Sequence, residues 1–526
     1  MKQKIKKTRV IIVGGGITGI AAALYLAQQG VDFILIEKHK GTSVYPRART
    51  IDVRTMELFR GLGLNEDLRE GGKALAPAWG ILHGTNLLET LQDPISIANK
   101  LTPQQLIAAQ NEMKELAEKS PESLCRCTQD ISEAIMYDAA LKQDADLRFN
   151  HQMLSFEQDE SEVKILVQNR NTGEKYMITA DYMIAADGAN SIVRNQLSIP
   201  VSGNGPGTNL LNIYFEADLE SLVKGREFSQ FLVETTEITG FLLTINNKNK
   251  WAFHLRFYPE NGESIADYPE EKIIMILRQI LGIPDLKISI LTVMPWKLTV
   301  NIASRLHAGR IFLAGDAAHT MTPYAGKGAN TGIQDVQNLA WKLSAVLKKH
   351  AGETLLDTYN TERQPIGSYY ATLSGELANR NGLINDALMV TKGKDLMGVP
   401  NYGYDSSAVL RRADLPFAYF TGEPGTRVPH LWLDEAKTVS SLDWIKGQFV
   451  LIANTGNEWH AECNEVLQKL DISIRLVTLD EENILKKWAL LTNTNVGEAL
   501  LIRPDDFVAA KLTSGGLLAA LQSILR

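Results

Sequence analysis

Two glycine-rich stretches, far apart in the sequence, carry the residue types that could do chemistry. The first is GGGITG at residues 14–19, and the second is the segment 309–343, where Gly315 and Asp316 precede another glycine-rich loop. Glycine lets a backbone approach a pyrophosphate, whose charge then meets N–H groups at the start of a helix. Two loops of this kind in one chain indicate a flavin dinucleotide site.

The first loop needs a strand before it and a helix after it. The apolar residues 10–13 predict the strand, and the Ala-rich run 17–29 predicts a helix that Gly30 can end. Glu37 ends the next apolar run at about the ~20-residue spacing where an acidic side chain accepts from an adenosine ribose hydroxyl. An acid there disfavours a 2′-phosphate, so FAD or NAD fits better than NADP. The alternative is an accidental glycine-rich turn, which this strand, helix and acid fit less well.

Composition sets the broad class. The chain has 526 residues, of which 44% are apolar and 22% charged, as expected of a globular protein with about three domains on the ~150-residue prior. A net charge of -7 leaves no basic stripe, so we expect no nucleic-acid partner. The absence of an apolar stretch of transmembrane length predicts no membrane association.

The cysteines predict a reducing cytoplasm and no metal site. Only Cys125, Cys127 and Cys463 occur, too few for a disulfide framework in a chain of this length. Cys125 and Cys127 could be read as a redox or metal pair, but no His or Cys partner lies near them in the sequence. Two incidental thiols are the simpler interpretation.

Short β-rich runs dominate the middle of the chain, and a glycine, proline and asparagine cluster at 398–404 suggests a linker. The predicted strands are 163–167, 176–179, 182–185, 211–215, 241–245 and 251–258, followed after the linker by 449–453, 472–477 and 499–502. The strands between about 200 and 295 indicate a mostly antiparallel sheet inserted into the nucleotide domain. The residues after the linker indicate a separate α/β domain.

Three motifs taken together resemble a known family. GGGITG, the stretch DGANSIVR at 187–194 and the Gly-Asp segment match, in order and spacing, the FAD fingerprints of the class A FAD-dependent aromatic hydroxylases, such as para-hydroxybenzoate hydroxylase and phenol hydroxylase. The runs at 46–64 and 503–511 are similar to the longer subgroup that oxidises phenols and aromatic polyketides. The resemblance spans essentially the whole chain.

The resemblance implies an α/β fold, α+β overall, with three domains. A discontinuous Rossmann-like FAD-binding domain would span 1–75, 101–198 and 296–397. An antiparallel-sheet substrate domain would span 76–100 and 199–295. A thioredoxin-like C-terminal domain at 405–526 contains Cys463 and no CxxC motif, so it would be structural or dimer-forming and not a redox centre.

The resemblance also assigns cofactor contacts. Glu37 would hold the adenosine ribose, Arg47 and Gln129 would lie along the FAD, and Asp316 would bind the ribityl chain. Asp187 would lie between the flavin phosphates and the passing nicotinamide nucleotide, with a simple helix cap as the alternative. The full set of predicted cofactor-binding residues is Gly14, Gly16, Thr18, Gly19, Glu37, Lys38, Arg47, Ala48, Gln129, Asp187, Gly188, Gly315, Asp316, Pro323, Gly326, Gly328, Ala329 and Asn330.

The loop from Pro323 to Asn330 is predicted to pack beside the isoalloxazine, where its N–H groups would stabilise the charge of the reduced ring. Pro323 and Lys327 are the predicted catalytic residues, because a cation at Lys327 would favour the anionic reduced flavin. Many polyketide hydroxylases read GGxGxN here, so the subgroup stays open. His319 could relay a proton or could simply be packed, and we leave it out of the catalytic set.

The aromatic residues of the inserted sheet are the candidates for a substrate cavity. Strand alternation places Trp251, Phe253 and Phe257 on one face, provided the strand runs unbroken to 257. The alternative is that they form an ordinary buried core face, as aromatic stripes commonly do.

By resemblance, the chain is an FAD-dependent monooxygenase. NADPH or NADH would reduce FAD, O2 would form a flavin C4a-hydroperoxide, and the terminal oxygen would hydroxylate a phenolic or polycyclic aromatic, polyketide-type small molecule. A Baeyer-Villiger oxygenase on the same fold and a non-catalytic flavin- or ligand-binding protein are the alternatives, whereas the WxWxIP motif of flavin halogenases is absent. The resemblance is also compatible with a homodimer and with a role in antibiotic biosynthesis.

Overall fold

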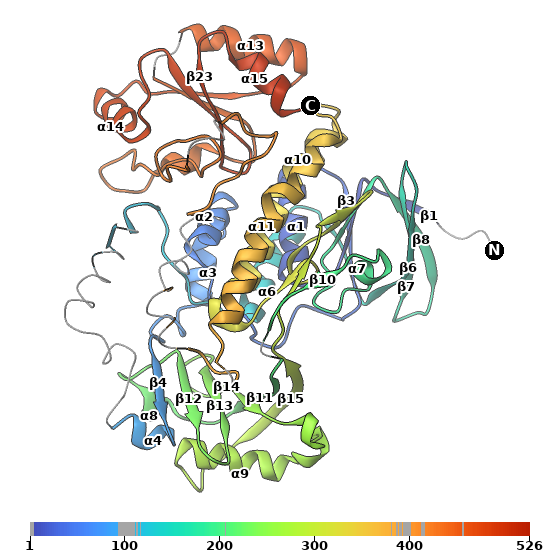
Figure 1. Ribbon diagram of the computed structural model, residues 1–526, viewed down its shortest axis with the longest axis vertical. Helices are drawn as coiled ribbons and strands as arrows, with labels where there is room; N and C mark the ends of the chain where they lie inside the picture. The colour runs from blue at the N-terminus through green and yellow to red at the C-terminus, as the bar shows by residue number, and fades with distance from the viewer. Residues whose placement is uncertain are drawn as a thin grey trace.

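The computed structural model describes residues 5–92, 111, 114–115, 117–205, 207–379, 381–385, 388, 392, 401–411, 416–454 and 457–526. The FAD-binding part, the inserted sheet and the C-terminal part lie one above another, with the C-terminal part at the top of the view and the inserted sheet at the bottom (Figure 1). The predicted domain limits at 100/101 and at 397 fall outside the described residues, so these limits stay predictions. Within the described ranges, no helix combines the length and apolar character that a membrane crossing needs.

A six-stranded sheet supports the two glycine-rich loops. Its order is β17 (His307–Ala308), β18 (Ile311–Leu313), β9 (Tyr182–Ala185), β2 (Val10–Val13), β3 (Phe33–Glu37) and β5 (Asp146–Phe149). All pairs except β17–β18 are parallel, so β2, β9 and β18 end at the same edge. Their apolar runs are buried, as expected of parallel strands covered on both faces. The Gly14 loop, Asp187 and Gly315 each follow one of these strand ends.

Helices cover this sheet and shape the site. They are α1 (Ile17–Gln28), α2 (Val53–Gly61), α3 (Asn65–Gly71), α6 (Gln129–Leu141), α7 (Ile192–Gln196), α10 (Gly328–Leu347) and α11 (Thr354–Glu376). The predicted helix at 17–29 is confirmed as α1, and Gly30 follows it with φ +64°. The long helices α10 and α11 run side by side through the middle of the molecule (Figure 1).

Two smaller sheets flank the FAD-binding part. One contains β1 (Ile5–Lys7), β8 (Lys175–Ala180), β7 (Val163–Asn169) and β6 (His151–Gln158). The other contains β10 (Val201–Ser202), β16 (Asn301–Ala303) and β19 (His319–Thr320). The predicted strands at 163–167, 176–179 and 182–185 are confirmed as β7, β8 and β9.

The inserted sheet has six strands and one parallel edge. Its order is β15 (Ser289–Lys297), β11 (Asn209–Glu216), β14 (Lys250–Arg256), β13 (Thr239–Thr244), β12 (Gln230–Glu234) and β4 (Ile81–Gly84). All pairs are antiparallel except β12 with β4, which confirms the predicted mostly antiparallel sheet. The short helices α4 (Leu87–Thr90) and α8 (Glu220–Val223) flank it, and α9 (Glu270–Leu281) lies at the bottom of the molecule (Figure 1).

The C-terminal part is a mixed four-stranded sheet with three helices, as expected of a thioredoxin-like domain. The strand order is β21 (Arg475–Thr478), β20 (Val450–Ala453), β22 (Glu498–Ile502) and β23 (Val508–Thr513), and the helices are α13 (Asn457–Leu470), α14 (Glu482–Thr492) and α15 (Leu517–Ile524). The three cysteines are free thiols, and Cys125 and Cys127 are buried.

Buried charges join the C-terminal part to α11. Arg503 donates to both carboxylate oxygens of Glu362, at 2.6 and 2.8 Å, and Lys342 reaches Glu362 at 2.7 Å. The neighbouring residue, Arg363, instead donates to Asp335 of α10 at 2.9 Å. All five side chains are fully buried, so adjacent residues of α11 connect the C-terminal part with the floor of the FAD-binding part.

Candidate functional site

The N-terminal loop is shaped by close approaches that only glycine permits. Gly14 has φ +105°, and a Cβ on it would lie 2.2 Å from the Ala186 carbonyl oxygen. A Cβ on Gly19 would lie 1.9 Å from the Gly14 carbonyl oxygen, so this glycine lets α1 pack onto the loop. Gly16 is the N-cap of α1 and contributes no side chain there. The loop therefore has the backbone form of a pyrophosphate cradle.

Glu37 lies beside this loop at the end of β3. Its carboxylate accepts from the Gly15 N–H at 2.7 Å and from the His39 N–H at 2.8 Å. These bonds fix the side chain at the edge where an adenosine ribose would lie, whereas Lys38 is exposed. The predicted ribose role of Glu37 is compatible with this placement and stays a prediction.

The predicted residues Arg47, Ala48 and Gln129 are brought together. The Gln129 N–H donates to the Ala48 carbonyl at 2.8 Å, and the Ala48 N–H donates to the Gln129 side chain at 3.4 Å. Gln129 also donates to Glu133 at 2.6 Å, and Glu133 accepts from the Ser43 N–H at 2.7 Å. Burial raises the pKa of Glu133, although these hydrogen bonds oppose the shift. The sequence analysis missed Glu133, which no motif marks.

Asp187 has one carboxylate oxygen committed and one available. Its Oδ2 accepts from the Val193 N–H at 3.2 Å, while its Oδ1 is enclosed and has no hydrogen-bond partner in the described residues. The helix α7 is capped by Ser191, whose Oγ accepts from the Arg194 N–H at 2.9 Å, and so does not depend on Asp187 alone. An enclosed acceptor beside Gly188, which has φ +84°, fits a bound ligand better than a simple cap.

Thr18 brings the two glycine-rich segments into contact. A Cβ on Gly315 would lie 2.5 Å from the Thr18 hydroxyl oxygen, and a Cβ on Gly332 would lie 2.3 Å from the same atom. The side chain of Asp316 is exposed, yet enough protein surrounds it for burial to raise its pKa. That combination is expected of a carboxyl on the wall of a recess, where it could meet hydroxyl groups of a ligand.

The loop after Asp316 is held from below by Asn330. The side chain of Asn330 accepts from the Asp52 N–H at 3.0 Å and donates to the Gly326 carbonyl at 2.7 Å. Gly326 has φ +62° and, like Pro323, is exposed. The exposed Pro323 and Gly326 and the half-buried Gly328 and Ala329 thus form a supported edge, and its predicted place beside a flavin ring stays a prediction.

Lys327 is a paired cation, which changes the prediction made for it. Its Nζ lies 2.9 Å from Asp52 Oδ2 and 5.0 Å from the centroid of the Tyr370 ring, and the side chain is 2% exposed. Because Asp52 neutralises much of its charge, the structure supports a role in anchoring the loop to α2. This pairing weakens the predicted effect of the Lys327 charge on the flavin, and the catalytic role of Lys327 stays a prediction.

Asp335 organises the floor under the Gly-Asp motif. Its carboxylate accepts from the Gly315 N–H at 3.1 Å, and it pairs with His319 at 2.7 Å and Arg363 at 2.9 Å. Burial would raise the pKa of Asp335, but His319 and Arg363 hold it below its ordinary value. His319 is 2% exposed, which favours the packed interpretation over a proton relay.

The predicted substrate stripe faces away from these loops. Trp251 and Phe253 do share a face, but β14 ends at Arg256, and both side chains lie with Phe257 in a core packed against α9. Trp251 is fully buried and donates to the Ala217 carbonyl at 3.0 Å. This placement corrects the substrate assignment and supports the alternative of an ordinary core face, which we call the outer face of the sheet.

The opposite, inner face packs on the flavin loop through Tyr324 and Ala325. The register places one residue from each strand directly opposite the next, and these side chains share a face. This inner row consists of Met294, Asn212, His254, Phe241, Leu232 and His83. The sequence analysis overlooked Asn212 and the role of His254 on this face, because strand alternation does not say which face meets the cofactor.

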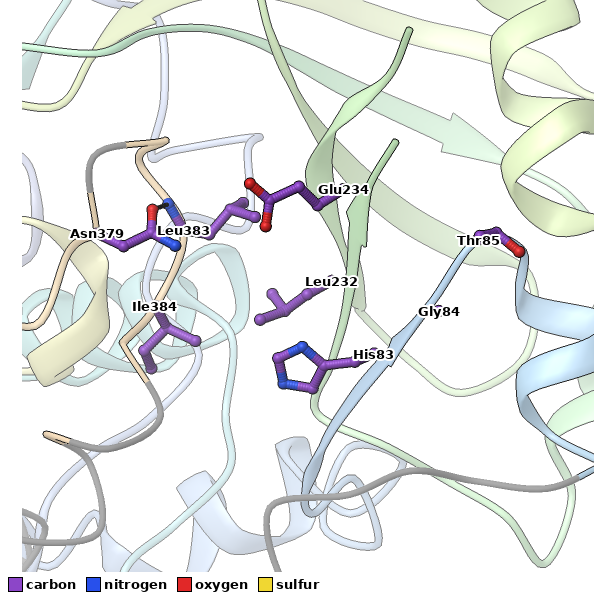
Figure 2. Close-up of a pocket in the computed structure, with 8 residues that line it drawn as sticks. All are labelled: His83, Gly84, Thr85, Leu232, Glu234, Asn379, Leu383 and Ile384. Carbon is purple, nitrogen blue, oxygen red and sulfur yellow. Dashed lines mark hydrogen bonds between the residues drawn. The ribbon is translucent and has the colours of Figure 1, made fainter. Parts of the chain in front are cut away.

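A pocket of about 310 Å³ opens at the β4 end of the inner row. In Figure 2, Leu383 and Ile384 lie on one side of it, facing Leu232 and His83 on the strands. Glu234 points toward the same side as Leu383. The volume is at the lower end of the range of ligand pockets, and the lining combines the aliphatic side chains of Leu232, Leu383 and Ile384 with the polar residues His83, Thr85, Glu234 and Asn379.

Comparison with known families gives the same assignment. Residues 7–373 match the family described as "FAD binding domain", and residues 421–526 match "Aromatic-ring hydroxylase, C-terminal". The chain belongs to the FAD-dependent aromatic-ring hydroxylases. The glycine cradle and the enclosed Oδ1 of Asp187 fit FAD, which the hydroxylase would hold through the residues placed above.

Relatives of this hydroxylase match over nearly its full length. It is 37% identical to the tetracenomycin A2 monooxygenase-dioxygenase of Streptomyces glaucescens, covering 98% of this chain and 96% of the relative. It is 36% identical to the tetracenomycin B2 monooxygenase-dioxygenase of Streptomyces olivaceus, covering 95% and 94%. Aklavinone-11 hydroxylase, solved with FAD and aklavinone, is 26% identical with a TM-score of 0.84 and coverage of 98% and 99%. The hydroxylase therefore shares both family and fold with enzymes named for tetracenomycin and aklavinone.

Proposed function

We propose that this hydroxylase uses NADPH or NADH, FAD and O2 to hydroxylate a phenolic, polycyclic aromatic compound of the polyketide type. The observation that carries the proposal is full-length similarity to two tetracenomycin monooxygenase-dioxygenases, in a chain whose inner sheet face packs on the flavin loop. The hydride donor, the route of oxygen transfer and the substrate class all belong to the proposal.

When bound, FAD supplies the redox chemistry, and the chain supplies binding, orientation and the exclusion of water. Gly14, Asp187 and Asp316 would hold the cofactor, and the loop from Pro323 to Asn330 would offer its backbone N–H groups to the ring. The inner row and the pocket beside Leu232 would provide a wall of mixed apolar and polar side chains on which a flat aromatic molecule could lie.

Arg49 ties the cofactor segment to this wall. It is buried and donates to the Thr244 carbonyl at 2.8 Å and to the Ser229 carbonyl at 3.2 Å, both on the inserted sheet. The segment that carries Arg47 and Ala48 is thereby fixed against the sheet. Such a link keeps the distance between substrate wall and cofactor constant, which positioning for oxygen transfer requires.

The test is stopped-flow reduction of the FAD-loaded enzyme by NADPH and by NADH, with and without a panel of phenols and hydroxylated polycyclic aromatics. We expect one polycyclic class to accelerate reduction and to be converted to a product carrying one oxygen from 18O-labelled O2 on a ring carbon. An ester oxygen in the product would show that the enzyme performs Baeyer-Villiger insertion and not ring hydroxylation. A flavin that neither nucleotide reduces would overturn the proposal in favour of a binding protein.

A further inference from the structure

His254 lies in the middle of the inner row and is 6% exposed. Its ring stacks on Phe241 with centroids 4.4 Å apart, and Phe241 in turn meets Tyr324 of the flavin loop at 5.9 Å. Trp296 flanks the ring on the β15 side at 5.7 Å. The histidine is therefore one ring away from the flavin loop and is framed by aromatic surfaces.

Asn212 determines which nitrogen of His254 carries the proton. The amide Oδ1 of Asn212 lies 2.5 Å from Nδ1, and since an amide oxygen only accepts hydrogen bonds, Nδ1 must donate. In the neutral ring the lone pair then belongs to Nε2, which lies farther from Cβ than Nδ1 and so farther out from the sheet. Asn212 is thus a positioning residue.

Nε2 of His254 is an available acceptor. In the described part of the chain this nitrogen has no hydrogen-bond partner. The atom is not fully enclosed, so a ligand can reach it. Burial, with a contribution from Arg49, lowers the pKa of His254 to about 3, so the ring stays neutral near pH 7. A neutral acceptor would attract a hydroxyl donor and repel a carbonyl oxygen.

We propose that His254 Nε2 accepts a hydrogen bond from a phenolic hydroxyl of the substrate, and so selects a hydroxyl over a quinone carbonyl at that ring position. This inference rests on the proposed function and specifies the substrate of the same site. A site built to bind a hydroxyl rejects analogues that lack it, because its own polar group is then left unpaired. Trp296, which is only half-buried, would lie against the flat ring system, while the fully buried Phe241 supports the imidazole from behind.

The experiment is a binding cycle on the FAD-loaded enzyme with 2-hydroxyanthraquinone and its methyl ether, followed through the change in flavin absorbance. His254→Phe keeps a flat ring on Phe241 but removes the acceptor. We expect roughly 10-fold weaker binding of the hydroxyl compound and less than about 2-fold change for the ether. Asn212→Leu should lose part of the same discrimination, because the proton is then free to occupy Nε2.

His430→Phe is the matched control, since burial also lowers the pKa of His430 to about 3 but this residue lies in the C-terminal part. It should leave both dissociation constants unchanged. If His254→Phe does not retain FAD, His254→Leu, which also removes the acceptor, is measured in its place. Equal losses for hydroxyl compound and ether would overturn the inference alone. Wild-type enzyme that responds to no hydroxylated polycycle, in binding or in flavin reduction, would overturn the proposed function and the inference with it.

Discussion

The two faces of the inserted sheet are both buried, but they bury different chemistry. The outer face carries Trp251 and Phe253 against α9, in a core of apolar side chains. The inner face mixes apolar residues with Asn212 and His254 and packs on the flavin loop. The outer face therefore mainly stabilises the sheet. The inner face has less apolar contact but carries polar groups that can select a ligand.

The largest effect should come from the outer face. Phe253→Ala removes a fully buried ring and should lower the free energy of unfolding by about 3–5 kcal/mol, measured by denaturant unfolding. Turnover per bound FAD should stay within about 2-fold of wild type, because the ring lies on the side away from the cofactor loop. A large fall in turnover with unchanged stability would contradict the assignment of the outer face to stability and the inner face to the ligand.

The next effect concerns the cofactor that the inner face is proposed to meet. Asp316→Ala should weaken FAD binding roughly 10- to 100-fold, because it removes a charged hydrogen-bond acceptor. The ratio of flavin to protein absorbance after purification measures this loss, with the exposed Asp285→Ala as control. Full flavin occupancy in Asp316→Ala would remove the ribityl assignment.

The two faces should also differ in their response to pH. The pKa of His254 is lowered to about 3 in the folded chain. As the pH falls below about 6.5, the unfolded chain therefore binds a proton at this residue while the folded chain does not. Stability supplied by the neutral ring is present above about pH 6.5 and is lost as the pH falls toward 3. Wild type should lose about 2 kcal/mol more than His254→Phe between pH 7.5 and 5.

Phe253→Leu is the control for this pH series, because the outer-face residue does not titrate. Denaturant unfolding at each pH should give it the same pH dependence as wild type, displaced by a constant amount. Parallel curves for wild type and His254→Phe would show that this histidine is not held neutral.

The smallest expected effect is a difference in KM between variants of two buried isoleucines, one on each face. Ile384→Val in the pocket wall and Ile276→Val in α9 should each lower stability by about 0.5–1.5 kcal/mol. Ile384→Val should also raise the KM for the aromatic substrate by up to about 5-fold, since it removes one methylene of contact. An equal KM change in Ile276→Val would place the substrate elsewhere.

Local sequence predicted the cofactor loops well because their constraints are local. Gly14 and Gly19 are needed for backbone approaches within one strand, turn and helix, and Gly315 follows directly from its strand. The inserted sheet was predicted as a sheet, but its orientation was not. Every residue from Trp251 to Leu255 is buried, so alternation paired Trp251 with Phe253 without showing which face meets the flavin loop.

Partners distant in the sequence explain the other differences. The prediction for Lys327 left out its partner Asp52, which lies in the distant 46–64 run, and nothing in the sequence indicates that the two side chains pair. The role inferred for His254 depends on Asn212 and Phe241, which two separate strands place beside it. Such pairings follow from sheet register, which a single sequence does not fix.

The adjacent residues Glu362 and Arg363 have a consequence for recombination between relatives. A chimaera that exchanges the C-terminal part must supply an arginine at 503 for Glu362, because a buried ion pair that loses one partner costs about 3–5 kcal/mol. One residue further along the same helix, Arg363 forms a buried ion pair with Asp335 under the Gly-Asp motif. A mismatched crossover should therefore weaken FAD binding as well as the attachment of the C-terminal part.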